Sequence, residues 1–266
     1  KTLFDFSSDV KINITMTPSA WADLSSKQCR SDSIYNDLYF PSNVEIYVNG
    51  TRYSFNEVGI RMKGNTSRAE FYDTNFRTAA HFKLNFKCTF DSSDYDDLGL
   101  SKYKHRWDNP EAKAERKDRN FVGLEKLDIK YIPRNTSGGG ECNAQECYVY
   151  ESFRKEGLLA PYSNICRSTL FDGSNTYAYN AEIIECVDKP FLKKRFSKAD
   201  AKGDLYKCTW GNSTDGANLS RADAVSKETD SSCYTVGTRI RNGLIGVEDV
   251  IHGYHPAYDL KTNDDA

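Results

Sequence analysis

The chain lacks long hydrophobic runs, an excess of charge of either sign, and more than a few histidines. Its longest apolar runs span only a few residues, whereas a membrane helix needs roughly 20, so we expect no membrane segment. Lys and Arg number 36 against 38 Asp and Glu, without a long basic run, so we expect no nucleic-acid partner. His81, His105, His252 and His255 are scattered and form no recognisable catalytic or metal-binding triad.

Cysteine pairs with the spacing of zinc ligands are also absent. The chain has eight cysteines, an even number that favours disulfides over metal. Six Asn-x-Ser/Thr tripeptides, the acceptor pattern for N-glycosylation, point to the same oxidising setting. We therefore expect a disulfide-stabilised protein that is secreted or displayed at the cell surface. The pairing is open, with Cys166 and Cys186 as one candidate across a hairpin. The tripeptides begin at Asn13, Asn49, Asn65, Asn135, Asn212 and Asn218.

Apolar and polar residues alternate along several segments, as expected for strands with one buried face. Residues 10–16 predict such a strand, and Thr17 followed by Pro18 predicts the start of a helix. Asn49-Gly50 between two alternating segments is a strong hairpin signal. Residues 144–156 are rich in helix formers and end at Gly157, which predicts a second helix.

The most informative segments are residues 58–68 and 81–87. Their apolar residues predict two strands that bury one face, while basic residues collect on the opposite face beside Gly64. Such an arrangement suits phosphate oxygens, which bind positive charges and backbone N–H groups. The alternative is that these lysines form an ordinary solvated strand face. The basic residues are Arg61, Lys63, Lys83 and Lys87.

In their order and spacing, several motifs resemble the spore coat protein H (CotH) family of atypical protein kinases. The resemblance spans roughly residues 42 to 262. Its motifs are Gly59-Ile-Arg-x-Lys-Gly64 with Ser67, Phe82-Lys83-Leu-x-Phe86, Glu146 with Tyr150-Glu-Ser-Phe-Arg-Lys-Glu-Gly157, Ala160-Pro161, Glu182-Ile-Ile-Glu185, Phe191-Leu192 and Gly203-Asp-Leu-Tyr-Lys207.

The resemblance implies an α+β fold: a protein-kinase-like N-terminal lobe of antiparallel sheet and a packed helix, over residues 1–187, with an insertion at about 91–120. A partial, helical second lobe would occupy residues 188–266. The implied activity is ATP- and magnesium-dependent phosphorylation of Ser or Thr on secreted or surface proteins.

The resemblance also implies roles for individual residues. Lys83 would hold nucleotide phosphates and pair with Glu146 on the helix, as phosphoryl transfer requires positioned positive charge. The other nucleotide-binding positions would be Arg61, Lys63, Gly64, Ser67, Glu185 and Val187. Glu146 has a plain alternative as a solvent-facing helix carboxylate.

The family's metal-binding aspartates follow a stretch that resembles residues 255–263, which would place them beyond Ala266; no metal ligands are therefore assigned within the chain. A second hypothesis is a noncatalytic extracellular binding or structural module, such as an adhesin or a component of an extracellular enzyme complex. Carbohydrate recognition by exposed aromatic residues is a third. The oligomeric state stays open.

Overall fold

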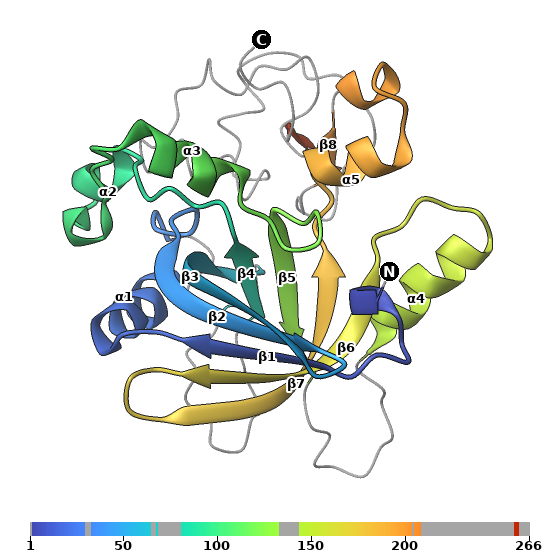
Figure 1. Cartoon of the computed structure of the whole chain (residues 1–266), viewed down its shortest axis with the longest axis horizontal. Coiled ribbons are helices and arrows are strands. Elements are labelled where there is room, and N and C mark those ends of the chain that lie inside the picture. The colour runs from blue at the N-terminus through green and yellow to red at the C-terminus, as the bar shows by residue number, and fades with distance from the viewer. Residues whose placement is uncertain are drawn as a thin grey trace, which may run out of the picture. The chain divides into compact units, whose positions relative to one another are not determined.

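The computed structural model describes residues 2–29, 33–64, 68, 81–132, 144–203, 205–208 and 258–260. The chain divides into two compact units, residues 1–186 and 187–266. The first unit contains the sheet and most of the described helices (Figure 1).

Seven strands of the first unit form one closed barrel, in the order β1-β2-β3-β4-β5-β7-β6. All neighbouring strands pair antiparallel except β1 and β6, which pair in parallel and close the barrel. The strands are β1 (Val10–Thr15), β2 (Phe40–Val48), β3 (Thr51–Lys63), β4 (His81–Asn85), β5 (Lys126–Tyr131), β6 (Ser163–Phe171) and β7 (Thr176–Glu185).

The alternation in the sequence corresponds to buried and outer faces of these strands. Val58, Ile60 and Met62 of β3 are fully buried, as predicted. Phe82 and Leu84 of β4, with Phe86 just beyond it, are fully buried too. The predicted hairpin joins β2 to β3, where Asn49 and Gly50 both adopt positive φ angles. Glycine adopts such a conformation without strain, and asparagine tolerates it better than most residues.

Among the described residues of the first unit, four helices and two short 3-10 turns accompany the barrel. As predicted, α1 begins with Thr17 as its N-cap, whose Oγ1 accepts the Ala20 N–H, and with Pro18 in its first turn. Gly157 follows α4 with a positive φ. The helices are α1 (Pro18–Gln28), α2 (Asp94–Asp97), α3 (Pro110–Asp118) and α4 (Gln145–Lys155); the 3-10 turns are η1 (Thr2–Phe4) and η2 (Ser101–Tyr103).

The polar stretch at 91–120 contributes to the core. Tyr95, Leu100 and Tyr103 are at most 8% exposed and belong to the same buried cluster as the barrel interior. The Tyr95 hydroxyl donates to the Tyr39 carbonyl at 2.6 Å. Buried rings at these positions therefore attach α2 and η2 to the barrel.

The expected kinase-like lobe is wrong, because the sheet is a closed seven-stranded barrel. Closure depends on the parallel pairing of residues 11–15 with residues 167–171, segments that lie more than a hundred positions apart in the chain. Alternation of inward and outward residues is the same along a barrel strand and along a strand of an open sheet with one buried face. The strand pattern therefore could not distinguish the two architectures.

The expected disulfides are also wrong for the part of the chain described. Among the described residues, none of Cys29, Cys88, Cys147, Cys166 and Cys186 forms a disulfide. The candidate pair is separated by register, since Cys166 lies opposite Ala181 and Cys186 lies five residues further along. Five residues of strand span about 16 Å, whereas a disulfide requires Cα atoms within about 7 Å.

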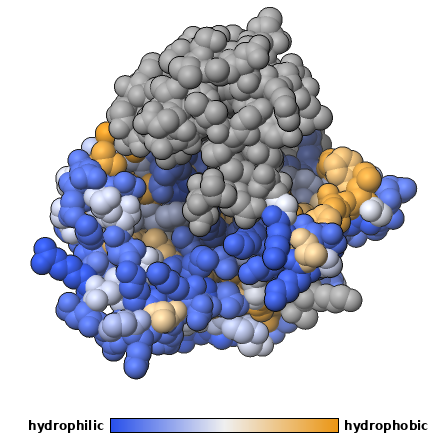
Figure 2. Space-filling view, turned by 90° about the horizontal axis from the view of Figure 1, so that it is seen from above, coloured by the Kyte–Doolittle hydropathy of each residue, from blue (hydrophilic) through white to orange (hydrophobic). Residues whose placement is uncertain are grey.

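Exposed large hydrophobic residues concentrate on α4 and the segment after it. Hydrophilic residues otherwise predominate on the face seen in Figure 2. Among the described residues, no helix is long and apolar enough to cross a membrane. The exposed residues of this region are Tyr148, Val149, Phe153, Leu158, Leu159 and Tyr162.

The described part of the second unit consists of short elements. Asp188 caps α5 by accepting the Phe191 N–H, and a proline lies in the first turn of the helix. Two three-residue strands pair antiparallel. The elements are α5 (Lys189–Arg195), η3 (Asp200–Lys202), β8 (Tyr206–Cys208) and β9 (Tyr258–Leu260).

Candidate functional site

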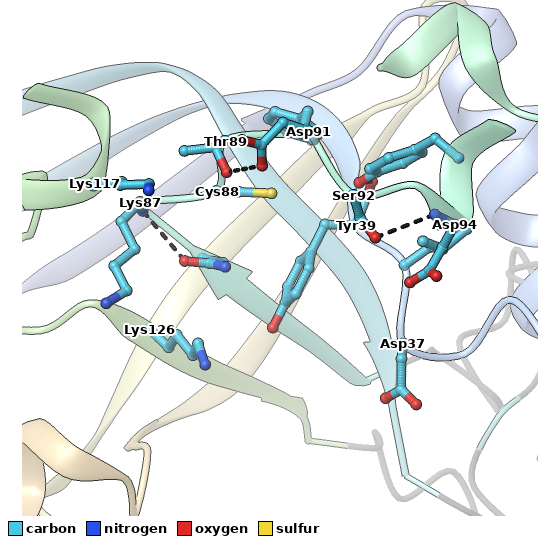
Figure 3. A pocket seen from close by; sticks show the side chains of 14 residues that line it. Asp37, Tyr39, Lys87, Cys88, Thr89, Asp91, Ser92, Asp94, Lys117 and Lys126 are labelled. Atoms are coloured by element: carbon cyan, nitrogen blue, oxygen red, sulfur yellow. Dashed lines mark hydrogen bonds between the residues drawn. The ribbon is translucent and has the colours of Figure 1, made fainter. Parts of the chain in front are cut away.

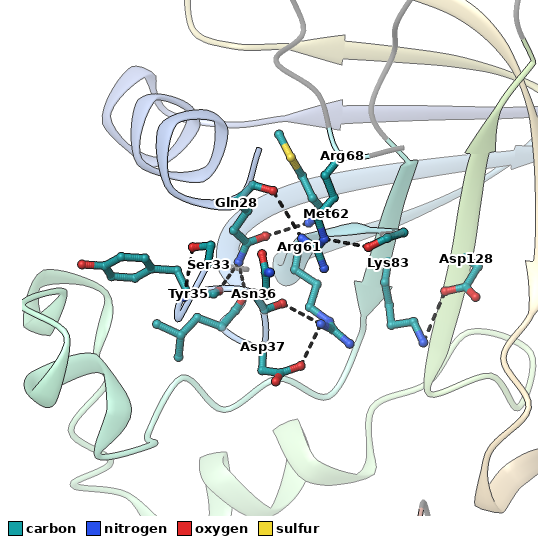
Figure 4. A network of polar contacts seen from close by, with 12 residues as sticks. Gln28, Ser33, Tyr35, Asn36, Asp37, Arg61, Met62, Arg68, Lys83 and Asp128 are labelled. Carbon is teal, nitrogen blue, oxygen red and sulfur yellow. Dashed lines mark hydrogen bonds and ion pairs between the residues drawn. The ribbon is translucent and has the colours of Figure 1, made fainter. Parts of the chain in front are cut away.

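Strand register brings charged residues together on the outer face of the barrel. Arg61 of β3 lies opposite Lys83 of β4, and Lys83 lies opposite Asp128 of β5. Their neighbours along each strand point into the core, so these three side chains share the outer face. Figure 4 shows Lys83 directed at Asp128 from the adjacent strand.

Two lysines share the carboxylate of Asp128. Lys63 donates a hydrogen bond to Oδ2, and the Nζ atom of Lys83 lies 3.4 Å from Oδ1. The Asp128 side chain is only 8% exposed, against 33% for Lys63 and 21% for Lys83. We call Arg61, Lys63, Lys83 and Asp128 the cation cluster.

The cluster remains charged at neutral pH. Burial alone would raise the pKa of Asp128, but Lys63 and Lys83 outweigh it and the pKa is lowered. Burial alone would lower the pKa of Lys83, but the attraction of Asp128 outweighs it and the pKa is raised. Each side chain therefore keeps the other ionised.

Arg61 is held by the segment that precedes β2. Its Nη1 donates to the Asn36 carbonyl at 2.6 Å and to Asp37 Oδ1 at 3.0 Å, and the guanidinium lies over the Tyr39 ring. The Nε atom is buried and has no hydrogen-bond partner among the described residues. The Arg61 side chain is itself 21% exposed, so part of the guanidinium is accessible to a further anion.

A fourth cation, Arg68, adds positive charge near Arg61. Its Nε donates to the Gly64 carbonyl at 2.7 Å, and Gly64 has a φ of 104°, which favours glycine. Burial and the nearby charge of Arg61 lower the pKa of Arg68 to about 10. Ser67, which the resemblance assigned to this loop, lies outside the described residues.

Glu146 and Lys83 do not form the expected ion pair. Glu146 of α4 pairs instead with Lys130 of β5, whereas the carboxylate at Lys83 is Asp128. A hydrogen bond attaches the first turn of α4 to β7, because the buried Glu182 side chain accepts the Cys147 N–H at 3.1 Å.

Glu185, one of the expected nucleotide-binding positions, does not lie on the face that carries the cation cluster. Glu185 lies opposite the core residue Leu127 and is 2% exposed; its Oε2 accepts the Tyr162 N–H at 3.2 Å. It therefore faces the opposite side of the sheet from Asp128. Val187 is 45% exposed and begins the second unit.

A cavity of about 430 Å³ is lined by Asp37 and Tyr39, the two residues that contact Arg61, but not by the four residues of the cation cluster. Figure 3 shows Lys87, Lys117 and Lys126 on one side of Tyr39, and Asp37 and Asp94 on the other. Two of its lining residues pack tightly on Gly59, because a Cβ there would lie 2.8 Å from the Cβ of Cys88 and 2.9 Å from that of Tyr39 and would clash with both. Tyr39 and Asp37 thus border both the cavity and Arg61.

The described residues do not supply the magnesium ligands that an ATP-dependent activity implies. No group of three or more His, Cys, Asp or Glu side chains in this part of the chain is arranged to hold a metal ion. Asp128 is already engaged by two lysines. These residues therefore do not fit a magnesium site, and we derive no step through the ion.

Asp128 is the site residue that the sequence analysis missed. The available signal was an aspartate between Leu127 and Ile129, two apolar residues that are buried in β5, since aspartate is uncommon in strands. Its partners could not be read from the sequence, because register with β4 depends on contacts distant in the chain.

Compared with models of known protein families, the chain matches none, and the curated proteins contain no match either. The fold and site define a barrel protein with a partly buried cationic cluster on its outer face.

Proposed function

We propose that the chain is an ATP-dependent protein Ser/Thr kinase of the kind that the CotH resemblance implies, acting on secreted or surface proteins, with nucleotide phosphates held at the cation cluster. One observation carries the proposal: three cations share a partly buried strand face, where Lys63 and Lys83 pair with the buried carboxylate of Asp128 and Arg61 pairs with the exposed carboxylate of Asp37. Phosphate oxygens would neutralise the positive charge that these carboxylates leave. Phosphoryl transfer depends chiefly on positioned positive charge of this kind.

The residues have distinct parts in this proposal. Lys83 and Lys63 would contact phosphate oxygens while Asp128 holds their ammonium groups in place, the bracing role first expected of Glu146. Arg61 would add planar, paired donors. The activity is proposed for the closed barrel itself and does not depend on a kinase-like lobe.

Lys83→Ala and Lys87→Ala provide a matched test. Lys83 lies in β4 and Lys87 two residues beyond its end, but Lys87 is paired with Glu125 at 2.6 Å and lies outside the cluster. Isothermal titration with ATP and Mg²⁺ should show at least about tenfold weaker binding for Lys83→Ala, or ~1.4 kcal/mol. Lys87→Ala should bind within about twofold of the wild type.

A transfer assay completes the test, with γ-labelled ATP and an unstructured Ser/Thr-rich acceptor protein. Labelled acceptor is expected with the wild type and not with Lys83→Ala. Equal binding losses in the two variants would mean that the charge is a solvated face. ATP binding without transfer would support the noncatalytic alternative.

A further inference from the structure

Gln28, the last residue of α1, is a fully buried polar side chain at the meeting point of three segments. Its Nε2 donates to the Tyr35 carbonyl at 2.6 Å and to the Leu38 carbonyl at 2.7 Å. Its Oε1 accepts the Met62 N–H at 2.8 Å. Figure 4 shows these bonds beside Arg61.

The bond to Met62 replaces a hydrogen bond that β2 no longer provides at the end of β3. The pairing of β2 with β3 ends at Phe40 and Ile60, so β3 continues through residues 61–63 paired only with β4. The Met62 N–H on the side that β2 has left would be buried without an acceptor, which costs about 1–3 kcal/mol. The side-chain Oε1 of Gln28 supplies that acceptor. Met62 is the residue between Arg61 and Lys63, so the bond holds the backbone that carries both.

The two bonds from Nε2 fix the partners of Arg61. Tyr35 and Leu38 flank Asn36 and Asp37, which accept the Arg61 guanidinium through a carbonyl and a carboxylate. One amide therefore fixes both the backbone that carries Arg61 and the segment that orients its side chain.

We propose that Gln28 is a positioning residue for the cation cluster and sets the orientation of Arg61 toward an anionic ligand. Gln28 would not touch the ligand. The identity of that ligand as ATP rests on the proposed function, whereas the coupling between Gln28 and Arg61 does not.

Gln28→Glu is the sharpest probe. A carboxylate of the same shape still accepts the Met62 N–H, but it faces the two carbonyls that Nε2 now binds and repels them. We expect ATP binding to weaken about tenfold in the wild-type background and equally in Lys87→Ala. In Arg61→Ala the same substitution should change binding by less than twofold. An equal loss in all three backgrounds would overturn the positioning role.

Urea unfolding of the same variants decides the inference without a ligand. Gln28→Glu should lower the unfolding midpoint less in Arg61→Ala than in the wild type, while its effect in Lys87→Ala should match the wild type. Equal shifts in all backgrounds would overturn the coupling. If Gln28→Glu does not fold, Gln28→Met, which loses all three bonds without adding charge, takes its place. Absence of ATP binding by the wild type would refute the proposed function alone.

Discussion

Two arginine-containing regions of the barrel differ in how completely their donors are used. At the end of α3, Arg116 and Arg119 form a pair that we call the arginine clamp. Arg116 donates to the carbonyls of Glu57 and Cys88 and to the Glu57 carboxylate. Arg119 donates to the carbonyls of Phe86, Asn56 and Glu57. The clamp binds backbone groups almost exclusively.

The backbone explains why the clamp is needed. The register of β2 and β3 shifts between Ser42 and Val44, which leaves Asn56 and Glu57 as extra residues opposite Asn43. Glu57 also adopts a φ of 52°. A bulge of this kind leaves carbonyls without ladder partners, and the two guanidinium groups bind them.

In the cation cluster, by contrast, hydrogen bonding is incomplete, since Asp128 Oδ1 makes no hydrogen bond within the described part of the chain. Arg61 Nε has no partner among the described residues, and Lys63 and Lys83 share Asp128. Saturated donors indicate a structural role, whereas surplus donors indicate a site that can accept a ligand.

Asp128→Asn should produce the largest change, because it leaves Lys83 partly buried without its counter-charge. We expect the free energy of unfolding to fall by about 3 kcal/mol at pH 7. The lowered pKa of Asp128 means that its contribution is present above the unfolded-state pKa of about 4 and is lost as pH falls through the folded-state value. Urea titrations from pH 7 downward should therefore show the difference between variant and wild type shrinking below about pH 4.

Asp37→Asn, at an exposed ion pair, is the control and should cost under ~1 kcal/mol. Equal losses for the two substitutions would show that the cluster is solvated and would remove the contrast with the clamp.

Arg119→Ala should have the next largest effect, and on stability only. Removing its three bonds to backbone carbonyls should lower the free energy of unfolding by about 2 kcal/mol, while ATP affinity stays within about twofold of the wild type. Arg61→Ala should show the reverse balance, with the greater effect on affinity. If Arg119→Ala weakened ATP binding as much as Arg61→Ala, the division into a structural and a ligand-binding region would be wrong.

The sequence predicted strand faces, turns and helix starts well, because each depends on residues that are close together in the chain. Alternation identified the buried faces of β3 and β4, and the turn and cap signals at Asn49-Gly50 and Thr17-Pro18 lie where the structure has them. Closure of the barrel was not predictable, because it requires β1 to pair with β6 in parallel.

For the site, the basic residues were identifiable and their partners were not. Arg61, Lys63 and Lys83 follow from the phase of two strands. The resemblance implied Glu146 as the partner of Lys83, and Asp128 was not considered. The register between β4 and β5 places Asp128 opposite Lys83, and Glu146 of α4 pairs with Lys130.

The smallest predicted effect concerns Asp37, which shares Arg61 with any incoming anion. Its carboxylate lies 3.0 Å from Arg61 Nη1 but is 62% exposed, so the pair should contribute well under ~1 kcal/mol to stability. A phosphate at Arg61 would be repelled by this carboxylate. Asp37→Asn removes the repulsion and keeps an oxygen for the guanidinium, so ATP affinity should rise about two- to fivefold, the equivalent of ~0.4–1 kcal/mol. Titration at low and high salt should show a larger gain at low salt, since screening weakens exposed charges. Weaker ATP binding by Asp37→Asn would contradict this prediction. It would mean that the Asp37 carboxylate orients Arg61 for the ligand and does not compete with the ligand for Arg61.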